Sequence, residues 1–225
     1  MIDYEILKKC GLFRGMDDSE IQDIVINLDG IVRTADKNTL LISEGDETNI
    51  ASIIISGSAL AYQEDYTGGF RNVIAELGPG ATISTSSSIL SIPHPLTVVT
   101  RDETVFFSFS MKRLFSRNII QSDHLIHFES NLLVQMSKTM SMLFEKITFL
   151  TQRTTRARLM SYLVAKSYEH KSKCFTITLN RQQLADYLGV DRAAMTVVLS
   201  ELMNDGYIVF NKNDFTLTQK TFDEI

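Results

Sequence analysis

The residues whose types and spacing could do chemistry gather near the C-terminus, in the stretch 181–200. This stretch reads RQQLADYLGVDRAAMTVVLS. Leu184 and Leu188 give its first half an apolar face, and Gly189 stands where a tight turn between two helices needs a positive φ. Asp191 can cap a second helix, because an aspartate side chain accepts hydrogen bonds from free backbone amides. The pattern predicts a helix-turn-helix, and a helix pair with a purely structural role is the alternative.

The second predicted helix has two faces with different expected roles. One face is apolar and is expected to pack on the rest of the domain: Val190, Met195, Val198, Leu199 and Leu202. The opposite face is expected to meet a nucleic acid: Arg192, Ala193, Thr196, Val197 and Ser200. Gly206 can end this helix. Apolar runs at 207–210 and 215–218, on either side of a turn at 212–214, predict a hairpin that makes the domain winged.

The side-chain chemistry assigns a role to each of these positions. Arg192 can donate two hydrogen bonds to O6 and N7 of one guanine, which makes it the main expected base reader. Thr196 and Ser200 are expected to contact bases or phosphates. Three residues at the start of the first helix are expected to hold the DNA backbone: Asn180, Arg181 and Gln182. Lys212 in the wing is a weaker candidate for a phosphate contact.

The charge distribution limits where a nucleic acid could bind. The chain carries 22 Lys and Arg against 27 Asp and Glu, for a net charge of −5. Residues 1–150 hold a net −7 and residues 151–225 a net +2. The acidic region is a poor partner for phosphates, so the C-terminal region is the expected docking surface. The weak charge of this region leaves open a sensor that acts through a protein partner instead of DNA.

The preceding segments supply a scaffold of helices and short strands. Asp17 or Asp18 can cap a helix with apolar residues at helical spacing from Ile21 to Leu28. Between Gly30 and Ser110, short β-rich runs alternate with turn signals, which predicts an antiparallel barrel or roll. The runs are Thr39–Ser43, Ala51–Ile55, Ala59–Gln63, Asn72–Leu77, Leu96–Thr100 and Thr104–Phe109.

A long helix is expected over about 122–152, followed by a helix over 156–169 and a strand over 174–179. Apolar residues of the helix over 122–152 recur at alternating intervals of three and four, as in a parallel coiled-coil dimer. The stripe consists of Leu133, Met136, Met140, Leu143, Ile147 and Leu150. A second apolar set can pack on the roll: Leu125, Phe128, Leu132 and Phe144. Two apolar faces need two partners, so the stripe predicts a homodimer seam, with packing in the chain's own core as the alternative.

In this order of elements the chain resembles the CRP/FNR superfamily of bacterial transcription regulators. The roll glycines fit the cyclic-nucleotide-binding roll at Gly45, Gly57, Gly68-Gly69 and Gly78-Pro79-Gly80, and LADYLGVDRAAM is close to clostridial-type members. The resemblance implies an α+β fold with an N-terminal antiparallel β-roll over 1–120, a dimerisation helix over 121–152 and a winged helix-turn-helix over 153–225. It also implies a homodimer that binds a palindromic operator, senses a signal in the roll and contacts RNA polymerase.

The sensor region departs from the members that bind cyclic AMP. Their phosphate cassette has a Gly-Glu pair where this chain has Ser84-Thr85, and an Arg-Ser pair where it has Pro95-Leu96. Arg101 is the nearest cation and comes several residues late. We therefore expect that cyclic AMP is not the effector, whose identity the sequence leaves unknown. The candidate effector pocket is the serine-rich segment and the facing region of the long helix, with a flexible loop as the alternative: Ser84, Thr85, Ser86, Ser87, Met140 and Ser141.

A further departure lies in the second helix of the helix-turn-helix. Similar clostridial-type members read Asp-Arg-Ser-Ala-Leu-Ser-Arg-Glu-Leu where this chain has residues 191–199, so their second Arg is Val197 here. A valine can offer only apolar contact, most favourably to a thymine methyl. Alternatively, Val197 rotates toward the core beside Val198. Either interpretation leaves Arg192 as the single charged reader, which predicts one strongly preferred guanine in each half-site.

The remaining candidate chemistry is sparse. An iron–sulfur cluster needs several N-terminal cysteines, and Cys10 is alone there, with Cys174 far away. His94 could be a haem ligand, and His124 and His127 could share a metal, but we interpret all three as loop and surface residues. No metal site is therefore predicted. The common hydrolase and P-loop motifs are absent, as are a signal peptide and a membrane-spanning run, so we expect a cytoplasmic regulator that is not an enzyme.

Overall fold

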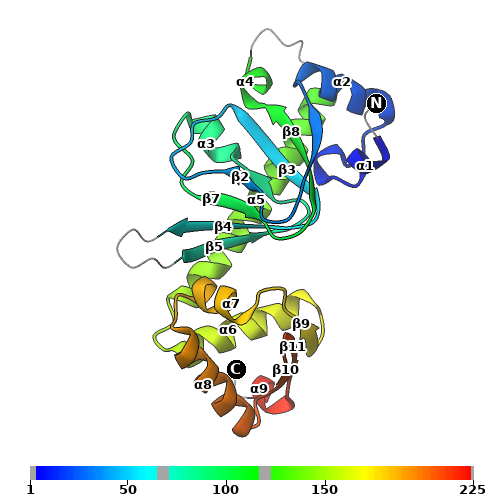
Figure 1. Cartoon of the computed structure of the whole chain (residues 1–225). Helices are drawn as coiled ribbons and strands as arrows, with labels where there is room; N and C mark the ends of the chain where they lie inside the picture. Colours follow the sequence, from blue (N-terminus) through cyan, green and yellow to red (C-terminus); the bar gives the residue numbers. More distant parts are fainter. Residues whose placement is uncertain (1–3, 65–70, 117–122, 224–225) are drawn as a thin grey trace. The chain divides into compact units, whose positions relative to one another are not determined.

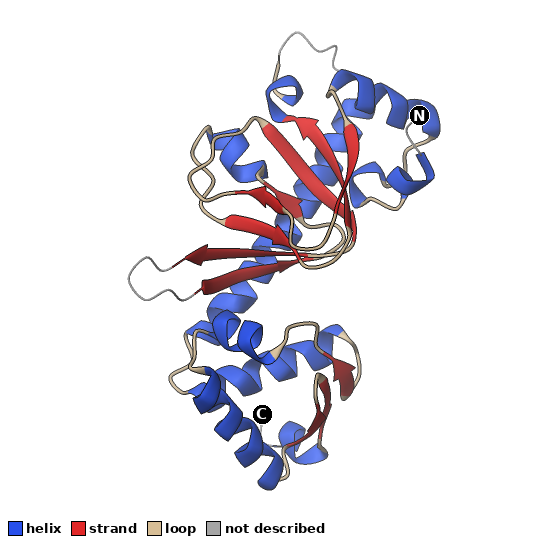
Figure 2. Ribbon diagram, viewed as in Figure 1, coloured by secondary structure: helices blue, strands red, loops and turns tan. Residues whose placement is uncertain are grey.

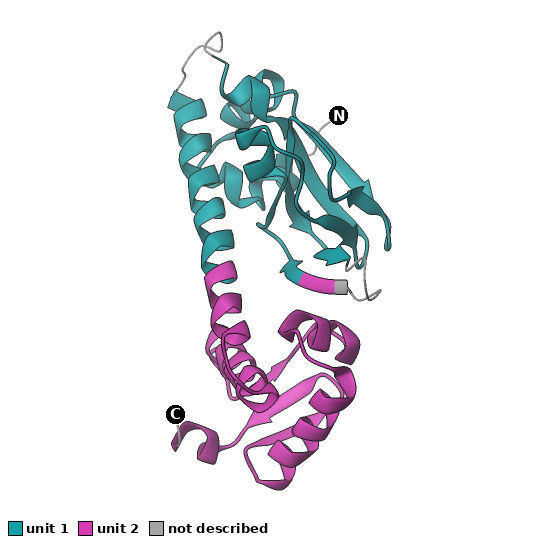
Figure 3. Cartoon of the chain, turned by 90° about the vertical axis from the view of Figure 1, so that its left-hand side faces the viewer, with its two compact units in different colours: residues 1–64, 74–142 teal, residues 65–73, 143–225 magenta. Residues whose placement is uncertain are grey.

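The computed structural model describes residues 4–64, 71–116 and 123–223. These residues form two compact units (Figure 3). The first unit comprises residues 1–64 and 74–142, and the second comprises residues 65–73 and 143–225. The domain boundaries predicted from the sequence, 120/121 and 152/153, lie on either side of the long helix, whereas the division into units falls within that helix.

The first unit opens with three short helices, α1 (Tyr4–Lys8), a 3₁₀ turn (Gly11–Phe13) and α2 (Asp18–Asn27). Asp17 is the N-cap of α2: its Oδ1 accepts from the amide of Glu20 at 3.0 Å, and the Glu20 side chain accepts from the Asp17 amide at 2.7 Å. This reciprocal pair satisfies two amides that the first turn leaves free. The predicted apolar residues Ile21, Ile24, Val25 and Leu28 are all buried, which confirms the helix.

Two four-stranded sheets form the roll (Figure 1). One has the order β1-β8-β3-β6, with β1 (Ile31–Ala35), β3 (Ile50–Ser56), β6 (Thr82–Ile83) and β8 (Thr104–Ser110). The other has the order β2-β7-β4-β5, with β2 (Leu40–Ile42), β4 (Ala59–Glu64), β5 (Arg71–Leu77) and β7 (Thr97–Thr100). All six predicted strands are present. β1 was not predicted because it is exposed along most of its length and so lacks an apolar alternation.

The core of the first unit unites the N-terminal helices, the sheet containing β3 and β8, and the long helix. Four phenylalanine rings pack there with centroids 5.1 to 5.7 Å apart, from Phe13, Phe107, Phe109 and Phe128. Aromatic pairs at such distances add to the stabilisation from burial alone. The serine-rich segment is not a loop but a short helix, α3 (Thr85–Leu90), which contacts β3 and α4 (Met111–Leu114) and buries Thr85, Ser87 and Ser88.

The long helix α5 (Asp123–Leu150) confirms the predicted element and ends two residues before the predicted end. Leu125, Phe128 and Leu132 are buried against the roll, as expected. Phe144 was expected to join them and is instead 60% exposed. Met142, which packs against the second core cluster of the roll, lies two residues earlier, so Phe144 is about 200° further around the helix and faces away from that cluster.

The second unit holds the C-terminal elements (Figure 2). These are α6 (Thr155–Glu169), β9 (Cys174–Thr176), α7 (Arg181–Leu188), α8 (Arg192–Asn204), β10 (Ile208–Asn211), β11 (Asp214–Leu217) and α9 (Gln219–Asp223). The three strands form one antiparallel sheet in the order β10-β11-β9. The predicted helices and hairpin are present, β9 is shorter than predicted, and α9 was not predicted. Among the described residues, every helix is too short or too polar to cross a membrane.

Candidate nucleic-acid interface

The turn between α7 and α8 has the local geometry that the sequence predicts. Gly189 has φ +60° and ends α7 in the left-handed region, where a residue without Cβ avoids strain. Asp191 then starts α8, with its Oδ1 accepting from the Ala194 amide at 2.8 Å. From the other side, Arg158 of α6 donates to the backbone oxygens of Leu188 at 3.2 Å and of Gly189 at 3.0 Å. These bonds satisfy free carbonyls at the end of α7 and fix its position relative to α6.

Helix α8 is divided into a buried and an exposed face. Met195, Leu199 and Leu202 are at most 1% exposed, and Val190 and Val198 are half-buried. The whole predicted reading face is exposed: Arg192, Ala193, Thr196, Val197 and Ser200. Val197 is 57% exposed, so the alternative in which it turns toward the core is wrong. An apolar side chain that faces water here is available for contact with a ligand.

Some polar side chains on the exposed face of α8 already form hydrogen bonds within the chain, and others do not. The Thr196 hydroxyl donates to the Arg192 carbonyl at 2.9 Å, and the Ser200 hydroxyl donates to the Thr196 carbonyl at 3.2 Å. Both hydroxyl oxygens keep lone pairs for outside donors. Arg192 is exposed and forms no ion pair with any described residue. Its guanidinium is therefore the strongest free donor group on the face.

The start of α7 lies next to the wing. Asn180 caps α7, with its Oδ1 accepting from the Gln183 amide at 2.9 Å, and its side chain is exposed. Gln182 is also exposed and donates to the Asp186 carboxylate at 2.8 Å. Arg181 is different, because its guanidinium donates to the backbone oxygen of Lys212 and is half-buried against the wing. Lys212 itself is exposed in the turn between β10 and β11, with φ +50°.

Two cations of this unit are held in ion pairs among the described residues. Arg156 pairs with Asp205 at 2.8 Å, which ties α6 to the end of α8, and Lys166 pairs with Glu169 at 2.6 Å. Arg156 and Arg158 were not predicted as functional residues, and nothing in their spacing distinguishes them from surface cations. Arg156 contacts the residue after α8, and Arg158 contacts the end of α7.

The stripe on α5 that was expected to form a dimer seam is largely uncovered. Leu133, Met140, Leu143, Ile147 and Leu150 are between 36% and 65% exposed. Met136 is half-buried and packs against the core of the roll. Val134 and Phe144 are exposed by 50% and 60% and widen the apolar surface. Exposed apolar side chains in such a row are typical of a surface that a partner covers.

In the roll, the expected effector residues separate into two groups. Ser84, Thr85 and Ser87 are buried, whereas Ser86, Met140 and Ser141 are exposed. The Ser87 hydroxyl donates to the Ser84 carbonyl at 3.1 Å, so it is already bonded within the segment. Thr85 is only 3% exposed, and its hydroxyl has no hydrogen-bond partner among the described atoms. On α5, Met142 packs against the roll where Met140 was expected.

His94, His124 and Arg101 each lie next to a polar group of the first unit. His94 is 7% exposed, so it is not a surface residue, and its Nδ1 lies 2.5 Å from the Leu96 carbonyl. His124 faces Asp23 at 3.4 Å and Glu20 at 3.6 Å. The guanidinium of Arg101 pairs with the Glu76 carboxylate. Within the described ranges, no group of three or more ligand-type side chains could hold a metal ion.

Each of the two units contains a segment that matches a known family model. Residues 32–118 match the model of the cyclic nucleotide-binding domain, and residues 157–221 match that of the Crp-like helix-turn-helix domain. No curated protein sequence matches the chain.

Several solved structures share the fold over nearly the whole chain. The c-di-GMP responsive global regulator CLP of Xanthomonas campestris is 22% identical with a TM-score of 0.71, over 89% of this chain and 99% of that one. A CooA mutant from Carboxydothermus hydrogenoformans is 16% identical with a TM-score of 0.70, over 94% and 91%. FixK2 from Bradyrhizobium japonicum is 16% identical with a TM-score of 0.68, over 86% and 96%.

Proposed function

The chain belongs to the CRP/FNR family of transcription regulators, and we propose that it binds a palindromic operator as a homodimer. The family is not enzymatic, and its helix-turn-helix binds DNA. The observation that supports the finer proposal is the division of α8, where one face is sealed in the domain core and the other carries an exposed, unpaired Arg192. Each α8 would enter a major groove, and the two half-sites would lie about 34 Å apart.

The proposed contacts follow from the exposed groups. Arg192 reads a guanine, Val197 packs on a thymine methyl, and Thr196 and Ser200 accept or donate at bases or phosphates. Ala193 leaves room for the groove wall. Asn180, Gln182 and Lys212 are exposed and available for phosphates at the rim of the site.

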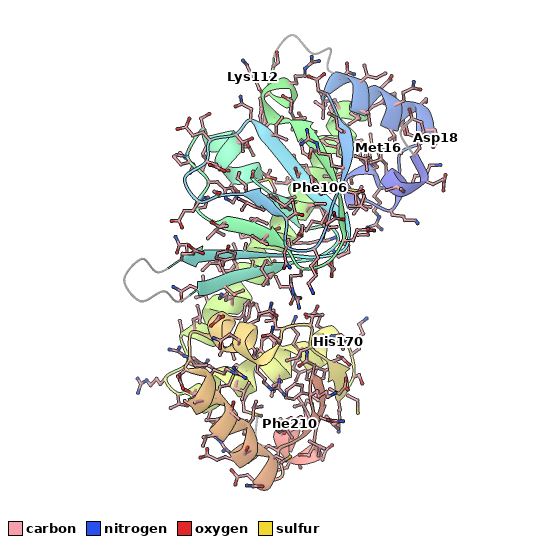
Figure 4. The ribbon with its side chains drawn as sticks, in the orientation of Figure 1. Met16, Asp18, Phe106, Lys112, His170 and Phe210 are labelled. Carbon is pink, nitrogen blue, oxygen red and sulfur yellow. The ribbon has the colours of Figure 1, made fainter. Side chains whose placement is uncertain are left out.

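Selection of binding sites from random DNA, followed by fluorescence anisotropy with the selected operator, tests this proposal. Arg192→Ala is expected to weaken binding by about 1–3 kcal/mol and to relax preference at one base position. Lys171→Gln is the matched control, because it removes an exposed cation next to His170, which Figure 4 shows beside β9 and away from α8. If no DNA is retained even at low salt, or if both variants weaken binding equally, the proposed reading face is wrong.

The dimer is proposed to form through the uncovered stripe on α5. Leu133, Met140, Leu143, Ile147 and Leu150 recur at heptad spacing and are exposed in the single chain. A parallel pair of α5 helices would bury them and would relate the two helix-turn-helix domains by a twofold axis, as a palindrome requires.

We further propose that the roll senses a signal and that the protein works with RNA polymerase in the cytoplasm. The residues do not fit a cyclic nucleotide, because Thr85 and Pro95-Leu96 replace the carboxylate and the guanidinium that such a ligand needs, and Arg101 is paired with Glu76. The buried, unpartnered Thr85 hydroxyl favours a small polar ligand near α3. Mass spectrometry of the supernatant from denatured protein would identify a retained ligand, and an empty supernatant would count against this assignment.

A further inference from the structure

The guanidinium of Arg181 lies against the wing, although the side chain begins at the first residue of α7. Its Nη2 donates to the backbone oxygen of Lys212, in the turn that joins β10 to β11. The central carbon of the guanidinium lies 5.4 Å from the ring centroid of Phe210 and 5.1 Å from that of Phe215. One side chain therefore contacts both strands of the wing and its turn.

The two aromatic partners of Arg181 belong to a continuous stack. Phe210 and Phe215 are directly opposite each other in the hairpin, and their centroids are 5.6 Å apart. Phe175 of β9 continues the stack at 6.2 Å from Phe215. Figure 4 labels Phe210 on this hairpin. A guanidinium near two aromatic rings is attracted to their faces, which fixes the hairpin against the start of α7.

Part of the Arg181 guanidinium is closed off from solvent by the wing. Its Nη1 is buried and has no hydrogen-bond partner among the described atoms. The guanidinium forms no ion pair within the described ranges of the chain, and burial lowers the pKa of Arg181 from its ordinary value. Because Nη1 has no exposed surface, a DNA phosphate could reach it only if the wing moved away. The adjacent Lys212 has the opposite character, since its side chain is exposed.

We propose that Arg181 is a positioning residue that holds the wing turn so that Lys212 can meet a phosphate, and that Arg181 itself does not contact DNA. This inference rests on the proposed DNA-binding function. It replaces the expectation from the sequence that Arg181 contacts the DNA backbone directly. An arginine suits this position because its planar guanidinium can stack on rings and presents several donors in a fixed fork, one of which reaches the carbonyl.

Hydrogen exchange of the full-length protein without DNA tests the positioning role by itself. Arg181→Met keeps an unbranched apolar stem but removes the guanidinium, so amides of 212–217 are expected to exchange at least tenfold faster. Lys212→Gln is the matched control and is expected to leave them unchanged. Amides within α6 serve as an internal reference for global unfolding. Unchanged exchange in the wing of Arg181→Met would overturn the proposal, whatever the protein does with DNA.

The salt dependence of operator binding then separates positioning from direct contact. Each phosphate contact contributes about 0.9 to the slope of log K against log salt concentration. Lys212→Gln is expected to remove about one such contact. Arg181→Met and Arg181→Lys are expected to reduce the slope by the same amount, because each would remove the contact made by Lys212. When Arg181→Met is added to Lys212→Gln, the slope is expected to stay at the value of Lys212→Gln alone.

Two results would contradict the positioning role. One is a wild-type slope in Arg181→Lys, since lysine would keep a direct phosphate contact. The other is the loss of a second contact when Arg181→Met is combined with Lys212→Gln. If the wild-type protein binds no DNA, the proposed function fails, and the exchange experiment still decides whether Arg181 holds the wing.

Discussion

Lys146 gives the second unit an unusual dependence of stability on pH. This residue of α5 is only 6% exposed, its Nζ donates to the backbone oxygen of Val73, and it lies 4.2 Å from the ring centroid of Tyr187. No carboxylate contacts it among the described residues. Burial therefore lowers the pKa of Lys146 from 10.5 to about 8. A proton on this amine is bound more weakly in the folded chain than in the unfolded chain, so protonation favours unfolding.

The size of this effect follows from the pKa change. A shift of one pKa unit corresponds to about 1.4 kcal/mol, so the protonated lysine costs about 3 kcal/mol of folding free energy below pH 8. The cost declines as the pH rises from 8 to about 10.5, where the unfolded chain also loses its proton. The hydrogen bond and the contact with the Tyr187 ring offset about 1–2 kcal/mol of it.

Urea unfolding of the wild type and Lys146→Met, followed by circular dichroism, measures this difference. At pH 7 the variant is expected to be more stable by about 1–2 kcal/mol, because methionine fills the same space without a charge. At pH 10 the sign is expected to reverse, since the neutral lysine still donates to Val73 and methionine cannot. Subtracting the two proteins cancels other groups that titrate in this range, including Cys10, whose burial raises its pKa to about 11. A difference that does not vary between pH 7 and pH 10 would refute the reasoning.

Four further outcomes are expected. Met140→Glu combined with Leu143→Glu would bring like charges together across the dimer seam at a cost of several kcal/mol, so sedimentation should show a monomer; a dimer would remove the seam assignment. Calorimetry with cyclic AMP should show no binding tighter than about millimolar, whereas a micromolar Kd, about −8 kcal/mol, would contradict the fit of the roll. A thiol reagent should modify exposed Cys174 in the folded protein and spare Cys10, which is 2% exposed; rapid loss of both thiols would contradict the burial of Cys10. Val197→Arg should tighten operator binding at low salt and add a second preferred base position, and an unchanged selected site would show that Val197 does not face the groove.

The sequence predicts the fold well wherever burial follows a regular period. The roll strands with alternating apolar residues, the heptad stripe of α5 and the capped α8 were all predicted, because period and cap chemistry are local properties. The exposed edge strand β1 and the buried helix α3 were not predicted. In α3 the buried residues are Thr85, Ser87 and Ser88, and hydroxyl side chains give no apolar period even when tertiary contacts bury them.

The candidate site was predictable to the extent that it lies on one helix. Spacing alone placed Arg192, Thr196, Val197 and Ser200 on the exposed face of α8, because a helix of known register determines which residues share a face. The environment of Arg181 could not be derived in this way. Its neighbours Phe210, Lys212 and Phe215 are about 30 residues away, and only the folded hairpin brings a carbonyl and two rings to its guanidinium.

A count of Lys and Arg in the sequence also overestimates how many cations are free to meet DNA phosphates, because the count cannot show which side chains are engaged within the domain. The C-terminal region holds 10 Lys and Arg, yet Arg156 is paired with Asp205, Arg158 bonds backbone oxygens at the end of α7, and Arg181 is stacked on the wing. These three arginines stabilise the shape that presents α8 and the wing, so they add little to the attraction for phosphates. Arg192 and Lys212 are exposed on α8 and on the wing turn, so binding is expected to be sensitive to single substitutions at these two positions.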